Sequence, residues 1–93
     1  MKHSETLTII DGNFTYEDAK EILTEIFSSK INFHKIKNWS SQEQFGKEDE
    51  IAQKRIPALI NEMEKLQAIL SEAKKYNKQL VISSEINIVL VDQ

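Results

Sequence analysis

The alternating side chains near the C-terminal end of the sequence constrain the fold more than any other feature. Over residues 80–90 the side chains follow the two-residue period of a β-strand, and most of those on one face are large and apolar. That face carries Leu80, Ile82, Ser84, Ile86, Ile88 and Leu90. A lone strand leaves backbone N–H and C=O groups unpaired, so a second strand should accompany it. A hairpin that bends at residues 83–85 is the weaker alternative.

A shorter alternating stretch near the N-terminal end supplies the partner strand. Leu7 and Ile9 alternate with Thr6 and Thr8, which is the period of a half-buried strand. The sequence DGN that follows is typical of a turn, because glycine and asparagine tolerate positive φ. We therefore predict one strand over about residues 5–10 and another over about residues 79–91.

The second half of the sequence between these strands has a regular helical pattern. Steps of 3, 4, 3, 4 and 3 residues, the spacing of a coiled-coil seam, connect Ile56, Leu59, Met63, Leu66, Leu70 and Ala73. Acidic residues 48–50 precede this row and lysines follow it, which complements the helix dipole. We predict a helix over about residues 48–77. Pro57 either kinks this helix or begins a new one, and a kink is favoured because Ile56 is a poor cap.

The first helical segment is less regular. The same steps connect Ala19, Ile22, Ile26, Ser29, Phe33 and Ile36. Thr15 is a good N-cap ahead of this row, because its hydroxyl accepts a backbone N–H of the first turn. We predict a helix over about residues 15–38. The alternative is a helix that ends near Ser29, followed by an extended KINFH segment, since Ile31 lies off the row.

Two helices of similar length joined by a short connection pack antiparallel as a hairpin. The predicted fold is therefore α+β, in the order β-α-α-β, with an antiparallel two-helix hairpin packed on a small antiparallel sheet. We treat the 93 residues as a single domain. The side chains expected to face the helices from the sheet are Leu7, Ile9, Ile82 and Ile86.

The small size of the chain and the length of its last strand predict a homodimer. A domain of this size buries only about 60–65% of its surface, and small domains often gain burial by associating. The C-terminal strand is predicted to be about twice as long as its partner, and an unpaired apolar strand end attracts another chain. We expect Ile86, Ile88 and Leu90 to contact the second copy, either edge to edge or face to face.

The stretch NWSSQEQFGK is predicted to form the turn between the helices, over residues 39–47. Gly46 suits the left-handed conformation that ends a helical turn. Trp39 and Phe45 have two interpretations. They cover the open end of the helical hairpin, which the sequence favours, or they form an exposed aromatic pair that contacts a partner.

The sequence offers little chemistry. It has no cysteine, and its histidines, His3 and His34, lack the spacing of metal ligands. Glycines 12 and 46 stand alone, so no phosphate-binding loop is present, and no serine lies in a nucleophile-elbow motif. The carboxylates lie off the apolar rows. We expect no catalytic residue, no metal, no cofactor and no enzymatic activity.

A basic cluster lies toward the end of the first helix, where no acidic residue occurs between Ile26 and Gln42. Its members are Lys30, Lys35 and Lys37. Three lysines neutralise few phosphates, so we interpret the cluster as a solvated helix face rather than a nucleic-acid site.

Much of the chain resembles a group of short uncharacterised bacterial proteins. The similar stretches are NFTYEDAKEIL, then KINFHKIKNWSSQEQFG, a helix rich in Lys and Glu, and an alternating last strand. The residues that carry the resemblance are Phe14, Thr15, Ala19, Ile22, the KINFH run, Ser40, Ser41, Glu43, Phe45 and Gly46. The resemblance implies a small self-contained bacterial domain, and it implies no activity or ligand.

The sequence therefore favours a small interaction or assembly module that acts as a homodimer. The absence of cysteine fits a reducing cytoplasm, and we expect neither a signal peptide nor contact with a membrane. One alternative is a nucleic-acid-associated protein that uses the face of Lys30, Lys35 and Lys37. A weaker alternative is a small-ligand or enzyme site in a dimer cleft.

Overall fold

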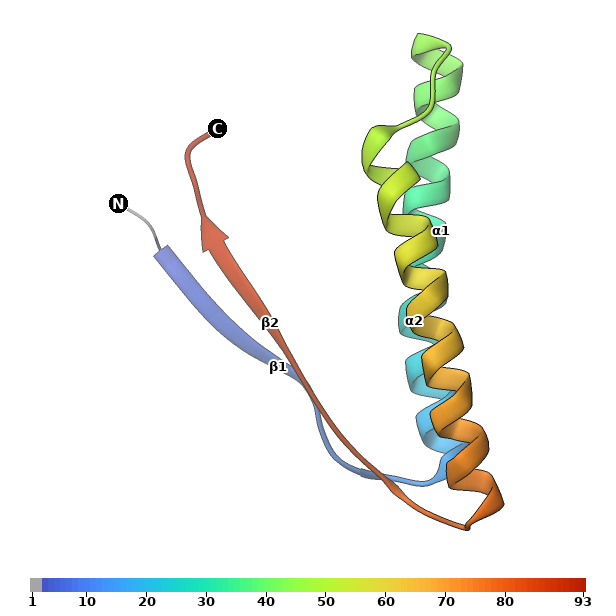
Figure 1. Cartoon of the computed structure of the whole chain (residues 1–93). Coiled ribbons are helices and arrows are strands. Elements are labelled where there is room, and N and C mark those ends of the chain that lie inside the picture. The colour runs from blue at the N-terminus through green and yellow to red at the C-terminus, as the bar shows by residue number, and fades with distance from the viewer. Residues whose placement is uncertain (1–2) are drawn as a thin grey trace.

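A computed structural model describes residues 3–93 and shows a helical hairpin joined at one end to a two-stranded ribbon (Figure 1). The elements are β1 (His3–Phe14), α1 (Tyr16–Phe45), α2 (Glu50–Lys75) and β2 (Leu80–Leu90). The two strands form one antiparallel sheet, and the two helices lie side by side. This arrangement confirms the predicted α+β class and the order β-α-α-β.

Helix α1 is longer than the sequence indicated. It begins at the predicted cap, where the Thr15 hydroxyl accepts the backbone N–H of Asp18 at 3.2 Å. It then continues through the KINFH segment as far as Phe45, so the extended alternative and the turn over residues 39–47 are both wrong. The polar residues of this stretch have only modestly unfavourable helix propensities. The helix therefore extends to Gly46, which has φ 68° and donates its N–H to the carbonyl of Gln42 at 2.9 Å.

Helix α2 passes through Pro57 without interruption, so it does not restart there. Its N-cap is Asp49, whose carboxylate accepts the backbone N–H of Ala52 at 2.9 Å. The predicted row lies in the interface with α1. Leu59, Leu66, Leu70 and Ala73 are buried, while Ile56 and Met63 are half-buried.

The row of α1 that faces α2 differs from the predicted one. Ala19 is buried as expected, but the row then continues through Leu23, Phe27, Ile31 and His34. The predicted row turns away from α2, since Ile26, Phe33 and Ile36 are exposed. The helix carries apolar side chains along two rows on different sides. His34 belongs to the row that faces α2 and is buried, and its ring lies at 77° to the ring of the neighbouring Phe33, with 5.3 Å between the ring centres.

The two strands are paired along their whole length. His3 lies opposite Leu90 at one end, and Phe14 lies opposite Leu80 at the other. The DGN sequence is part of β1 rather than a turn, so the predicted difference in strand length is wrong. A bulge between Thr8 and Ile10 adds one unpaired residue, Ile9. An extra residue moves the following side chains to the other face, so that Ile10, not Ile9, shares a face with Leu7.

The ribbon packs against the helices near its base, and Ile10 is its one buried side chain among the described residues. At the base Phe14, Leu80 and Ile82 pack against the buried cluster of Ala19, Leu66 and Leu70. Beyond this base the ribbon diverges from the hairpin, and the molecule measures 49 × 36 × 15 Å (Figure 1). Leu7, Ile9 and Ile86 are exposed, so the expectation that they contact the helices is wrong.

Candidate interaction surfaces

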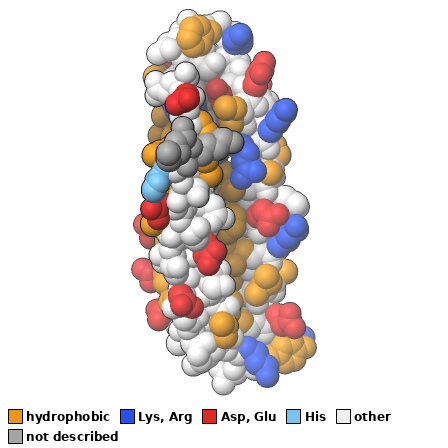
Figure 2. Space-filling model, turned by 90° about the vertical axis from the view of Figure 1, so that its left-hand side faces the viewer, with side chains coloured by type: hydrophobic (Ala, Val, Ile, Leu, Met, Phe, Trp, Pro, Cys, Tyr) orange, Lys and Arg blue, Asp and Glu red, His pale blue; other side chains and the backbone are white. Residues whose placement is uncertain are grey.

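The two faces of the ribbon differ in polarity: one carries most of the large apolar side chains, and the other is mainly polar apart from Val81 and Val89. Residues that lie opposite each other in a sheet share a face, so the pairing places Leu7 with Ile86, and Ile88 and Leu90 follow on the same side. We call these four side chains the apolar ribbon face. On the other face the hydroxyl of Thr6 donates to the Asn87 side-chain oxygen at 3.0 Å. Figure 2 shows mostly polar side chains on the outer side of the ribbon, with hydrophobic side chains in the recess beside it.

The apolar ribbon face brings together the three strand residues that the sequence singled out. Ile86 and Ile88 are 42% and 41% exposed, and Leu90 is 60% exposed. On the β1 side of the same face the outermost residues are polar, and the His3 ring lies 3.0 Å from the Glu5 carboxylate. The apolar surface is therefore concentrated along β2.

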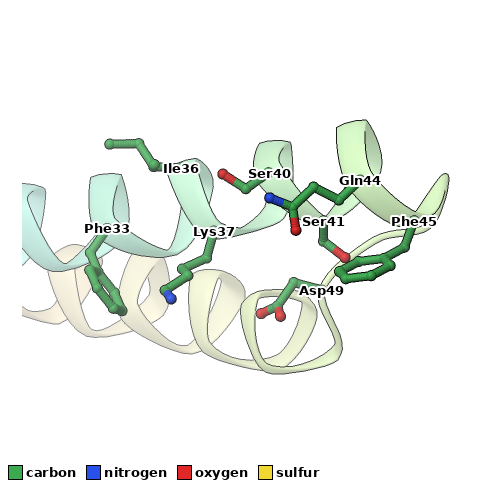
Figure 3. A pocket seen from close by; sticks show the side chains of 8 residues that line it. All are labelled: Phe33, Ile36, Lys37, Ser40, Ser41, Gln44, Phe45 and Asp49. Carbon is green, nitrogen blue, oxygen red and sulfur yellow. The ribbon is translucent and has the colours of Figure 1, made fainter.

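The aromatic residues near the hairpin tip do not cover its end. Trp39 is 63% exposed and Phe45 is 69% exposed, so the covering interpretation is wrong. Phe45 lines a shallow groove with Asp49 and the end of α1, whereas Trp39 lies outside that groove (Figure 3). The structure therefore does not bring the two rings together as a pair.

The row of α1 that turns away from α2 is a second apolar surface, exposed at Ile26, Phe33 and Ile36 and half-buried at Ile22. It consists of Ile22, Ile26, Ser29, Phe33 and Ile36, and we call it the outer seam of α1. Two shallow grooves run along this row and meet at Phe33. The sequence revealed the spacing of this row but assigned it to the contact with α2.

The basic cluster is partly engaged within the chain. The ammonium groups of Lys30 and Lys37 lie 5.2 and 5.8 Å from the centre of the Phe33 ring, within the range of a cation–π contact. These contacts hold both lysines beside the outer seam.

Within residues 3–93 no group of three or more His, Asp or Glu side chains is arranged to hold a metal ion. None of the described helices is both long and apolar enough to cross a membrane. His3 and His34 lie on different elements, one at the outer end of the ribbon and the other inside the hairpin.

Comparisons of the chain with family models, with curated proteins and with solved structures give no match.

Proposed function

We propose that this protein is a small assembly module that acts as a homodimer, with the apolar ribbon face as a contact between the two copies. The observation that supports this proposal is the exposure of Ile86, Ile88 and Leu90 on one side of a ribbon whose other side is mainly polar, with smaller apolar side chains at Val81 and Val89. Covering half-exposed side chains of this size contributes about 2–4 kcal/mol for the three together.

The total surface of a single chain also supports association. The accessible surface is 7697 Å² for a mass of 10.8 kDa. A compact monomer of that mass exposes about 5,500 Å². The chain thus exposes roughly 2,000 Å² more than a compact monomer, while a standard interface buries about 800 Å² on each partner. A second copy of the chain can cover this surplus.

A contact between faces suits the ribbon better than a contact between edges. The strand pairing already satisfies one edge of β2 along its whole length, so no strand end is left without a partner. Pairing of two outer edges would extend the sheet and leave Ile86 and Ile88 exposed to water. Contact between two apolar ribbon faces covers these side chains and leaves the polar faces in solvent.

The substitution Ile88→Lys tests this proposal. We expect it to weaken dimerisation at least tenfold in sedimentation measurements at micromolar concentration, while helical content stays unchanged, because Ile88 lies far along the ribbon from the hairpin. Asn87→Lys is the matched control, since it adds the same side chain to the polar face. Wild-type protein that sediments as a monomer would refute the proposal.

A further inference from the structure

The outer seam of α1 has the spacing of a coiled-coil seam but no helix of its own chain against it. From Ile22 the steps are 4, 3, 4 and 3 residues, through Ile26, Ser29 and Phe33 to Ile36. Helix α2 packs on the other row, which contains the buried Ile31 and His34. A seam that is used within the chain would be buried, whereas Ile26, Phe33 and Ile36 are exposed.

The charged residues beside this seam have opposite signs on its two flanks. Glu25 directly precedes the seam residue Ile26, and Lys30 directly follows the seam residue Ser29. Both line the groove that contains these seam residues. In heptad terms Glu25 occupies a g position and Lys30 the e position five residues later, and side chains at these positions form salt bridges between two helices.

The flanks also determine the direction of a partner helix. In a parallel pair of helices, the g flank of one helix faces the e flank of the other, so Glu25 of each copy meets Lys30 of the other. In an antiparallel pair like flanks meet, which brings Lys30 and Lys37 against the same lysines of the second copy. The charges therefore favour a parallel pair.

We propose that two copies of the chain pack their α1 helices in parallel along the outer seam, with Glu25 of each copy paired to Lys30 of the other. This proposal rests on the proposed homodimer and specifies its symmetry. The two-fold axis runs along the helices, so both ribbons leave the helices at the same end. The surplus surface of roughly 2,000 Å² per chain is enough for both contacts.

Exchange of the two charges tests the pairing. Residues 25 and 30 are five positions apart and do not face each other on one helix, so any effect of one on the other comes from the second copy. We expect Glu25→Lys and Lys30→Glu each to raise the dimer dissociation constant about tenfold at low ionic strength. The double variant, in which both charges are exchanged, should return to within about threefold of wild type.

Mixing the two single variants gives an independent readout. A chain with Lys at both positions and a chain with Glu at both positions should form a mixed dimer as tight as the wild-type dimer. Glu64→Lys on the exposed surface of α2 is the control for charge reversal alone and should have no effect. Single variants that dimerise like wild type, or a double variant as weak as the singles, would overturn the pairing.

A cysteine cross-link tests the parallel direction. The natural chain has no cysteine, and Ser40 continues the outer seam four residues after Ile36. In a parallel dimer Ser40 faces itself across the axis, so we expect Ser40→Cys to form an intermolecular disulfide on mild oxidation. Ser71→Cys, on the exposed surface of α2, is the control and should not cross-link. A wild-type monomer would refute both proposals, whereas a dimer without the Ser40 cross-link would refute only the parallel α1 contact.

Discussion

Asn38 of α1 holds the start of α2 in place: its side-chain oxygen accepts the backbone N–H of Asp49 at 2.8 Å. Asp49 in turn caps α2 by accepting the N–H of Ala52 at 2.9 Å. The two hydrogen bonds follow one another, so they join the body of α1 to the first turn of α2. The short connection between the helices is therefore fixed at its far end by a side chain that lies within α1.

Substitution of Asn38 should destabilise the connection between the helices. We expect Asn38→Ala to lower the free energy of unfolding by about 1 kcal/mol, because the Asp49 N–H is partly buried and loses its acceptor. Urea unfolding at fixed protein concentration measures the change. Asn32→Ala, at an exposed position of the same helix, is the control, and equal losses for the two variants would contradict the role of Asn38.

Truncation of Leu66 should be far more costly. This side chain is buried in the cluster where both helices and the ribbon meet. We expect Leu66→Ala to cost about 2–5 kcal/mol of stability, through lost burial and the cavity left behind. Gln67→Ala beside it is exposed and should change stability by less than about 0.5 kcal/mol. A loss for Leu66→Ala as small as that of the control would mean that the seam of α2 is not packed.

His34 lies in the interface between the helices, where an apolar side chain fits better. We expect His34→Leu to raise the free energy of unfolding by about 1 kcal/mol, because burying an imidazole costs more than burying a hydrocarbon group. Thermal unfolding followed by circular dichroism measures the gain. His3→Leu, at the exposed end of the ribbon, should leave stability unchanged. A loss of stability in His34→Leu would indicate that the imidazole makes a favourable polar contact in the interface.

Trp39 should report on an open environment. Because it is 63% exposed in the single chain, its fluorescence should be quenched by acrylamide almost as readily in the dilute, monomeric protein as in urea. Its emission maximum should also shift little on unfolding. Since Trp39 is the single tryptophan of the chain, no other residue contributes to the signal. In the proposed dimer Trp39 directly precedes Ser40 of the α1 contact, so it should be quenched less readily there. Strong protection in the dilute monomer would contradict the exposure of Trp39 in the single chain.

The sequence predicted the elements well and their contacts less well. The row of α2 from Ile56 to Ala73 was found because that helix has one dominant apolar row. Helix α1 has two rows with similar spacing, and spacing alone does not tell which one α2 contacts. The prediction assigned the row with Ile22 and Ile26 to the contact with α2, whereas the residues buried against α2 are Ile31 and His34 of the other row.

The errors in the ribbon have a similar origin. A bulge changes which side chains share a face, yet Ile9 and Ile10 are chemically identical, so the sequence gives no sign of which is the extra residue. The position of the ribbon relative to the helices also escaped prediction, because alternation indicates a strand but not what covers it. The candidate residues Ile86, Ile88 and Leu90 were correctly grouped, since they follow the two-residue period without interruption.

The pairing of the first strand with the last has a consequence for the order of folding. Of all the paired strand residues, Phe14 and Leu80 are the closest in sequence, and the whole helical hairpin lies between them. Pairing the strands in an unstructured chain therefore means closing this long loop, at an entropic cost of about 4 kcal/mol. Once α1 and α2 have packed, they bring Phe14 and Leu80 together and most of that cost has already been met. Contacts between neighbouring helices form quickly, whereas strand pairs distant in sequence form slowly. The ribbon should therefore zip last, from its base outward, and its outer end should be the first part to open.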